Sequence, residues 1–263
     1  MHPLVNIAMS AARQAGDLAL RYSEQLDRIK ITEKKANDFC SEVDVKAEQI
    51  IIQTIRKHYP SHGIMAEESG MHEGSDETVW IIDPLDGTSN YLHGFPFYSV
   101  SIAVQHKKRI EHGVIYDPIR KEFFTASRGG GAQLNDTRIR ISKQTQLSKA
   151  LLGTGFPFRN KELCERHFAT FQSLFGQCSG VRRAGSAALD LAYVAAGRLD
   201  GFWEFGLRPW DIAAGSLLIK EAGGLVGDIS GGEQYMKTGN IVAGNPKLFK
   251  SLLQTIGPAL KSQ

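Results

Sequence analysis

The sequence lacks several features that would place the chain in a specialised class of protein. Its 263 residues include only 3 cysteines, Cys40, Cys164 and Cys178, which are too few and too scattered for a disulfide framework. It has no apolar run of membrane-spanning length, no repeat, no low-complexity tract and no block of like charge. We therefore expect a cytoplasmic globular protein with no membrane association.

The amino-terminal segment also lacks the pattern of a secretory signal. Apolar residues between Leu4 and Tyr22 recur at helical spacing, but Arg13 and Asp17 interrupt them. This pattern predicts an amphipathic helix near residues 3–24. The net charge of +3 comes from dispersed basic residues, so charge alone does not indicate a nucleic-acid-binding surface.

Several familiar catalytic motifs are missing as well. The chain has no Walker-type glycine-rich loop, and the glycine run at residues 129–131 predicts a hairpin turn. None of the cysteines has an arginine at the spacing of a cysteine-phosphatase cradle. We therefore expect neither P-loop chemistry nor thiol catalysis.

The most informative stretch that is present is Asp-Pro-Leu-Asp-Gly-Thr at residues 83–88. The apolar approach at residues 78–82 predicts a strand covered on both faces, and Pro84, which has no N–H, is expected to end its pairing. Two carboxylates would then lie at the carboxyl end of a strand, with a helix beginning at Thr88. Oxygen ligands in this arrangement suit Mg²⁺, although the same aspartates could simply cap the turn and helix.

Other acidic residues follow or begin predicted elements. Glu67 and Glu68 come after an expected strand at residues 63–66, which would bring a third carboxylate to the same neighbourhood. Asp211 lies at the start of a helix predicted over residues 212–222. A solvated loop and a charge that complements the helix dipole are the simpler explanations, and these residues alone leave both open.

The remaining pattern predicts an α/β protein. A helix near residues 42–58 precedes the strands already described, and three further strands over 97–104, 109–116 and 121–126 resemble a meander. A strand at 151–154 begins alternating strands and helices. We expect one compact unit in two parts. Residues 1–148 would hold helices, a mostly antiparallel sheet and most metal ligands, and residues 149–263 would hold Asp211 and substrate-side residues.

Three segments taken together resemble the inositol monophosphatase family, and within it the bacterial SuhB branch. They are Ala-Glu-Glu-Ser at 66–69, Trp-Ile-Ile-Asp-Pro-Leu-Asp-Gly-Thr at 80–88 and Pro-Trp-Asp-Ile-Ala-Ala-Gly at 209–215. Segments at 35–44, 185–191 and 222–224 extend the resemblance over nearly the whole chain. It implies a layered αβαβα sandwich of the inositol monophosphatase and fructose-1,6-bisphosphatase type.

The resemblance also implies a role for individual residues. The ligands of two or three Mg²⁺ ions would be Glu67, Asp83, the Leu85 carbonyl, Asp86 and Asp211, with Asp83 bridging two ions. Glu67, Thr88 and Asp44 would be catalytic, the last two by positioning the attacking water. The substrate would contact Asp86, Gly87, Thr88, Arg182, Ala187, Glu204 and Asp211.

The residues themselves leave simpler explanations open for some of these assignments. Asp44 lies three positions after Ser41 and fits a capping box of the helix that follows. Glu204, between two aromatic residues, could be a charge at the rim of the fold. Arg182 and Arg183 could be a surface pair, and the sequence does not decide which of them faces a substrate.

The function implied is a Mg²⁺-dependent, Li⁺-sensitive phosphatase, a homodimer, that hydrolyses myo-inositol 1-phosphate with metal-activated water. An aspartyl-phosphate mechanism of the haloacid dehalogenase kind is disfavoured, because its two aspartates are one residue apart and here Pro84 and Leu85 separate them. Adenosine bisphosphate, fructose bisphosphate and histidinol phosphate remain alternative substrates. The SuhB branch also implies an alternative of another class, a regulatory partner of the transcription machinery in ribosomal RNA antitermination.

Overall fold

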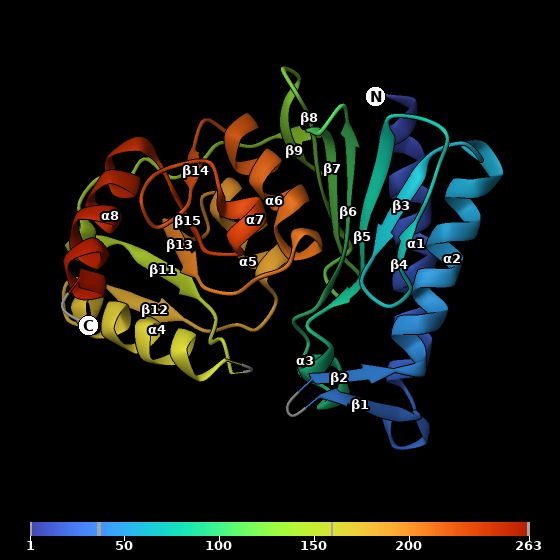
Figure 1. Ribbon diagram of the computed structural model, residues 1–263, viewed down its shortest axis with the longest axis horizontal. Coiled ribbons are helices and arrows are strands. Elements are labelled where there is room, and N and C mark those ends of the chain that lie inside the picture. The colour runs from blue at the N-terminus through green and yellow to red at the C-terminus, as the bar shows by residue number, and fades with distance from the viewer. Residues whose placement is uncertain (1, 36–37, 159, 262–263) are drawn as a thin grey trace.

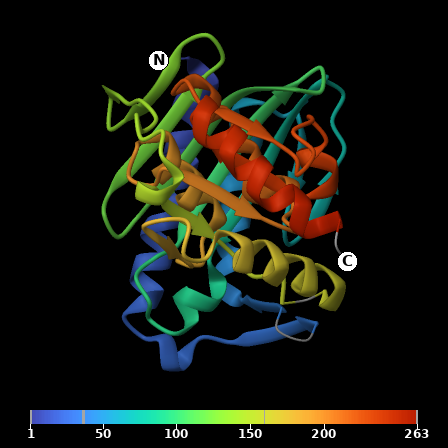
Figure 2. The same ribbon diagram turned by 90° about the vertical axis from the view of Figure 1, so that its left-hand side faces the viewer.

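Alternating layers of helices and sheets make up the fold, in a computed structural model that describes residues 2–35, 38–158 and 160–261 (Figure 1). Helices α1 (Pro3–Ser23) and α2 (Glu42–His58) cover the outer face of the first sheet. Helices α5 (Ala187–Ala195) and α6 (Pro209–Glu221) fill the middle. A second sheet and the outer helices α4 (Lys161–Leu174) and α8 (Pro246–Lys261) complete the order αβαβα, which confirms the predicted fold class (Figure 1). Figure 2 shows α4 and α8 in front of the second sheet, on the side that faces the viewer.

The first sheet has eight strands in the order β10-β9-β8-β7-β6-β5-β3-β4. Every neighbouring pair is antiparallel except β3 with β5. The strands are β3 (Gly63–Ala66), β4 (Gly70–His72), β5 (Thr78–Asp86), β6 (Ser99–His106), β7 (Arg109–Asp117), β8 (Glu122–Ser127), β9 (Gly131–Leu134) and β10 (Thr137–Arg138).

The second sheet has five strands in the order β12-β11-β13-β15-β14. Its central strand β11 pairs in parallel with both β12 and β13. The strands are β11 (Leu151–Thr154), β12 (Gly180–Arg182), β13 (Gly201–Glu204), β14 (Leu225–Gly227) and β15 (Ile241–Gly244). The smaller elements are β1 (Ile31–Lys35) paired with β2 (Asp38–Ser41), the helices α3 (Thr88–Leu92) and α7 (Tyr235–Thr238), and two short 3₁₀ turns at Leu26–Arg28 and Leu147–Lys149.

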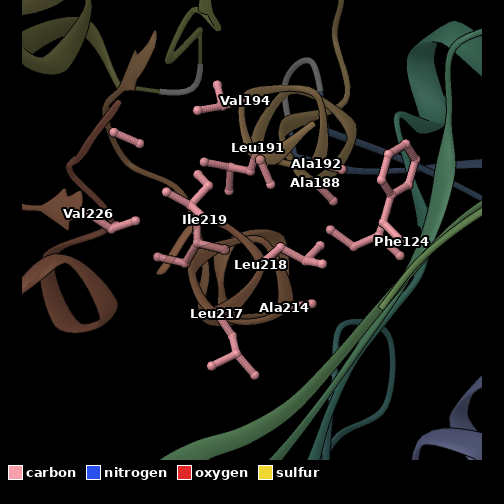
Figure 3. Close-up of a cluster of buried hydrophobic side chains, with 14 of the residues drawn as sticks. Phe124, Ala188, Leu191, Ala192, Val194, Ala214, Leu217, Leu218, Ile219 and Val226 are labelled. Atoms are coloured by element: carbon pink, nitrogen blue, oxygen red, sulfur yellow. The ribbon is translucent and has the colours of Figure 1, made fainter. Parts of the chain in front are cut away.

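The two middle helices are apolar around most of their circumference because a sheet covers each side of them. In α6, every residue from Ile212 to Ile219 is buried. Figure 3 shows side chains of α5 and α6 packed between Phe124 of the first sheet and Val226 of the second. This shared core joins the two sheets into one body. Of the helices in the described ranges, none is both long and apolar enough to cross a bilayer.

The predicted helices near 3–24 and 42–58 and the strands at 63–66 and 151–154 are confirmed closely.

The prediction that Pro84 ends the pairing of its strand was wrong, because β5 continues to Asp86. A shift of register between Asp83 and Asp86 absorbs the proline, and Asp86 then pairs with Ser99. A bulge of this kind tolerates a residue that cannot donate to the ladder. Residues 36 and 37, within the resembling segment, lie outside the described residues. The division near residue 148 stays a prediction.

The contact between α6 and the first sheet depends on a glycine. A Cβ atom at Gly113 in β7 would lie 2.9 Å from the carbonyl oxygen of Ala214 and 3.0 Å from its Cα. We predict that Gly113→Ala lowers the free energy of unfolding by about 1–3 kcal/mol, because backbone rather than a flexible side chain must move.

A matched substitution in a position with more room should have little effect. A Cβ at Gly180 in β12 would come no closer than 3.4 Å to another atom, so Gly180→Ala should not lower the free energy of unfolding. Urea unfolding of both variants measures the difference. Equal midpoints for the two would contradict the close packing of α6 on β7.

Candidate active site

Three aspartates that are distant in sequence converge at one point. Carboxylate oxygens of Asp83, Asp86 and Asp211 all lie within 4.8 Å of one another. The first two come from the bulged end of β5, and Asp211 comes from the first turn of α6. Three carboxylates at this separation repel one another strongly unless a cation or protons compensate their charge.

Hydrogen bonds hold each of these carboxylates in place. Asp83 Oδ1 accepts from the backbone N–H of Leu85 at 3.0 Å, and Asp211 Oδ2 accepts from the N–H of Arg208 at 2.6 Å. Asp86 Oδ2 accepts from Ser186 Oγ at 2.5 Å and from the N–H of Ala188 at 2.7 Å. The start of α5 is thereby fastened to the end of β5.

Glu67 reaches the same cluster through strand pairing. Because β3 and β5 are parallel and Ala66 lies opposite Ile82, Glu67 follows its strand beside Asp83. The N–H of Glu67 donates to the Ile82 carbonyl at 3.2 Å, and its charge acts on Asp83. Glu67 and Leu85 both line the cavity that the three aspartates face.

Thr88 and Asp44 form the pair expected from the resemblance. The Thr88 hydroxyl donates to Asp44 Oδ1 at 2.8 Å and also lies 3.1 Å from the Leu85 carbonyl oxygen. Asp44 Oδ2 accepts from the Ser41 N–H at 2.8 Å and from its hydroxyl at 2.5 Å, so the predicted capping box is confirmed as well. Asp44 is fully buried and does not line the cavity, which places it behind Thr88.

The cluster opens into a cavity of about 460 Å³ between β5, β11, α5 and α6. Gly87, Thr88, Ala187 and Glu204, four of the predicted substrate residues, line it together with Asp86 and Asp211. Gly87 has a φ of +102°, and a Cβ there would meet the carbonyl oxygens of Phe97 and Gly185 at 3.1 and 3.2 Å.

The structure separates the two adjacent arginines. Arg182 does not line the cavity; its side chain is exposed and donates to the Val181 carbonyl at 3.2 Å. Arg183 does line it, with its guanidinium carbon 5.1 Å from the ring centroid of Phe158 and 5.8 Å from that of Phe156. Arg183 is therefore the better placed of the two to meet a bound anion.

Asp190 is a residue of the cavity wall that was not predicted from the sequence. Asp190 lines the cavity and is only 2% exposed. A signal for it was present, because Asp190 is the single charge in α5, whose sequence is Ala-Ala-Leu-Asp-Leu-Ala-Tyr-Val-Ala. A charge in an otherwise apolar helix needs a partner or a function.

Burial sets the electrostatics of the site. It raises the pKa of Asp83 and of Asp211 well above the ordinary range, and neighbouring carboxylates raise both further. Burial also raises the pKa of Asp86 to about 6, against the opposing hydrogen bonds from Ser186 and Ala188. The pKa of Glu204 rises to about 8 through burial and then the charge of Asp86. An all-oxygen donor set that holds excess negative charge fits a hard divalent cation such as Mg²⁺.

Comparison with known proteins identifies the family of the chain. The profile of the Inositol monophosphatase family matches residues 1–260. The chain belongs to the inositol monophosphatase family. Members of the family with solved structures share the whole fold rather than one sheet. A structure of the extragenic suppressor protein suhB from Bartonella henselae superposes with a TM-score of 0.94 at 42% identity, covering 97% of this chain and 98% of that one.

Two further members of the inositol monophosphatase family show the same full-length similarity. Inositol monophosphatase from Anabaena (Nostoc) sp. has a TM-score of 0.87 at 39% identity, covering 99% of this chain and 98% of that one. A curated relative from Pseudomonas aeruginosa, named Nus factor SuhB, is 56% identical over 99% of this chain and 98% of its own length. The resemblance to the SuhB branch is confirmed by these matches.

The raised pKa values predict a pH-dependent stability in the absence of metal. Folding raises the pKa of Asp86 to about 6 and that of Glu204 to about 8, so the folded protein holds more protons than the unfolded chain over this range. The free energy of unfolding should therefore fall as the pH rises from about 4 to about 8. In a chelator, we expect a lower melting temperature near pH 8 than near pH 5 by calorimetry.

Added Mg²⁺ should reverse that loss at the higher pH. A ligand at about 100 times its dissociation constant stabilises the folded state by about 2.7 kcal/mol. Asp83→Asn removes one of the mutually repelling carboxylates, so this variant should show a smaller pH dependence and little response to Mg²⁺. A melting temperature in chelator that does not change with pH would contradict this account of the cluster.

Proposed function

We propose that the protein is a Mg²⁺-dependent phosphomonoesterase that converts myo-inositol 1-phosphate to inositol and phosphate. The convergence of Asp83, Asp86, Asp211 and Glu67 on one cavity carries the proposal. Membership of the inositol monophosphatase family supports it, as does the name of the Anabaena relative. Cytoplasmic location and a homodimeric state complete the proposal.

The proposed metal ligands are Glu67, Asp83, the Leu85 carbonyl, Asp86 and Asp211. Two or three bound Mg²⁺ ions would neutralise phosphate charge and lower the pKa of a water molecule towards neutrality. Around that chemistry, the backbone at Gly87 and Thr88 would orient the phosphate. All of these residues line the same cavity, so the phosphate and the ligands share one space.

Thr88 and Asp44 would orient the attacking water. The Thr88 hydroxyl donates its hydrogen to Asp44, which leaves its oxygen lone pairs directed away from that carboxylate, where they can accept from water. Attack of the water oxygen on phosphorus would form a new P–O bond and break the ester P–O bond. The water would lose a proton to solvent, the leaving alkoxide would take a proton from solvent, and no phosphate would be transferred to the protein.

Glu204 and Ala187 would face the alcohol part of the substrate. Glu204 lies at the end of β13 and lines the cavity, and its carboxylate fills the space beside Gly155. A carboxyl group there suits a substrate that presents hydroxyl groups rather than a second phosphate. This favours an inositol phosphate over fructose or adenosine bisphosphate and over histidinol phosphate.

We predict that Asp83→Asn lowers Mg²⁺-dependent release of phosphate from myo-inositol 1-phosphate by about 1,000-fold or more, because the proposed bridging ligand is lost. Asp136→Asn, in the exposed turn between β9 and β10, serves as the control and should retain wild-type activity. The measurement is a panel of phosphomonoesters with Mg²⁺, repeated with added Li⁺, which should inhibit. Substantial turnover by the Asp83 variant, or a phosphoryl group trapped on Asp83, would contradict the mechanism.

A second function is favoured by the names of the curated relatives, which are called Nus factor SuhB. We propose that the protein also contacts the transcription machinery during synthesis of ribosomal RNA. A regulatory contact of this kind needs a surface and not the chemistry of the cavity. The two functions can therefore be separated by substitution.

In cells that lack the native gene, we expect Asp83→Asn to restore antitermination of a ribosomal RNA reporter to about the wild-type level while the variant stays inactive as a phosphatase. The reason is that Asp83 is 1% exposed and cannot contact a protein partner. Reporter readthrough and phosphatase assays on the same strains measure the two outcomes. A loss of readthrough that follows the loss of phosphatase activity would contradict a separate regulatory function.

A further inference from the structure

The carboxyl group of Asp190 has no partner that the structure accounts for. Its Oδ1 is shielded from solvent and makes no hydrogen bond among the described residues. No hydrogen bond to Oδ2 is present in the described ranges either, yet Oδ2 is not shielded in the same way. Asp190 lines the cavity, so an Oδ2 that is neither bonded nor fully shielded is available to a molecule bound there. A buried polar group left without a partner costs about 1–3 kcal/mol, which a ligand bonded to Asp190 would offset.

Two glycines place the carboxyl groups of Asp190 and Glu204 beside the same end of β11, and the charge of Glu204 acts on Asp190. Gly153 and Gly155 are two positions apart at the end of β11, so their missing side chains would be spaced by about 7 Å along one side of the strand. A Cβ at Gly153 would be 3.7 Å from the carboxyl carbon of Asp190. One at Gly155 would overlap the carboxylate of Glu204. The carboxyl groups of Asp190 and Glu204 therefore lie beside Gly153 and Gly155, respectively, at the end of β11.

Asp190 is also held at a fixed position relative to the aspartate cluster. The N–H of Ala188 donates to Asp86 at 2.7 Å, and Asp190 follows two residues later in the same helix, about 3 Å further along its axis. Ser186 begins that helix and donates to the same oxygen of Asp86. A phosphomonoester whose phosphate lies at the aspartate cluster would thus direct its alcohol part towards Asp190 and Glu204.

The surroundings of Asp190 and Glu204 favour a ligand that offers uncharged hydrogen-bond donors. Burial raises the pKa of both Asp190 and Glu204, which favours their uncharged forms, and the positive charge of Arg183 opposes that rise. Neither carboxyl group therefore requires a further cation. The hydroxyl groups of a polyol are neutral donors, and two neighbouring hydroxyls match two adjacent acceptors.

We propose that Asp190 is a specificity-determining residue that binds a hydroxyl group of the substrate alcohol beside the hydroxyl bound by Glu204, so that the cavity selects phosphomonoesters of polyols with neighbouring hydroxyls. This inference rests on the proposed phosphatase function, since the phosphate fixes the orientation of the alcohol. It adds a second hydroxyl contact to the one expected at Glu204.

The test compares two substrates of the same ring size, myo-inositol 1-phosphate and cyclohexyl phosphate, which has no hydroxyl groups. Asp190→Ala should lower kcat/KM for the inositol ester by about 10- to 100-fold, mainly through KM, and change kcat/KM for the cyclohexyl ester by less than about 3-fold.

Two control variants accompany this test. Asp190→Asn retains groups that can bond a hydroxyl, so its kcat/KM on either ester should fall by less than about 5-fold. Asp228→Ala removes another buried aspartate that does not line the cavity and should leave the ratio of the two substrates unchanged.

Two further measurements distinguish recognition from a structural role. The Mg²⁺ concentration at half-maximal activity and the melting temperature of Asp190→Ala should match those of the wild type within about 2-fold and a few degrees. Equal losses on both substrates, a shifted Mg²⁺ requirement or no change at all would each overturn the inference.

Failure of the proposed function would be recognised separately. If the wild type hydrolyses neither ester, the phosphatase proposal fails, and calorimetric titration with myo-inositol in the presence of Mg²⁺ and inorganic phosphate then decides the inference. Binding by the wild type that weakens by about 10-fold or more in Asp190→Ala would support Asp190 as a hydroxyl-binding residue. Absent binding, or equal binding by both proteins, would overturn it.

Discussion

Repulsion among crowded carboxylates is the constraint on which the rest of the site depends. Asp83, which is buried, and Asp86 and Asp211, which are partly buried, place oxygens within 4.8 Å of one another in surroundings that raise the pKa of each. Charges this close are unfavourable unless protons or cations compensate them. The fold tolerates it because backbone N–H groups fix each carboxylate and because hydrophobic contacts elsewhere supply the stability. A bound divalent cation would convert the repulsion into attraction, so metal binding and stability are linked.

The two middle helices, α5 and α6, connect the aspartate cluster to both sheets. Asp86 belongs to the first sheet but is bonded to Ser186 and Ala188 at the start of α5, while Asp211 begins α6. Both helices pack on both sheets, with Gly113 allowing the backbone of α6 to lie against β7. Cations held by these aspartates would therefore tie the two sheets together through their shared helices. The cavity lies at this junction because it is the place where strand ends and helix starts from both halves meet.

Local patterns predicted much of the fold and part of the site. Helical periodicity located α1 and α2 within a residue or so, and the pairing of Glu67 with Asp83 follows from two parallel strands that end together. The bulge at Pro84 could not be predicted, because a register shift depends on the partner strand β6. Nor could the orientations of Arg182 and Arg183, since the side on which each residue of a short strand lies depends on its neighbours in the sheet. Bringing Asp211 to Asp83 required the family resemblance, because no local pattern specifies a contact across so long a stretch of chain.

The same chemical group would serve two purposes in one cavity, and the surroundings would decide which. Asp83, Asp86, Asp211 and Glu67 crowd one end, where bound cations would offset their charge. At the other end the charge of Arg183 acts on Asp190 and Glu204. Burial raises the pKa of both carboxyl groups, and Arg183 opposes that rise. A buried carboxyl group in these surroundings can bond a neutral hydroxyl without a further cation. This end of the cavity would therefore suit a sugar-like alcohol, while the crowded aspartates would hold the proposed cations.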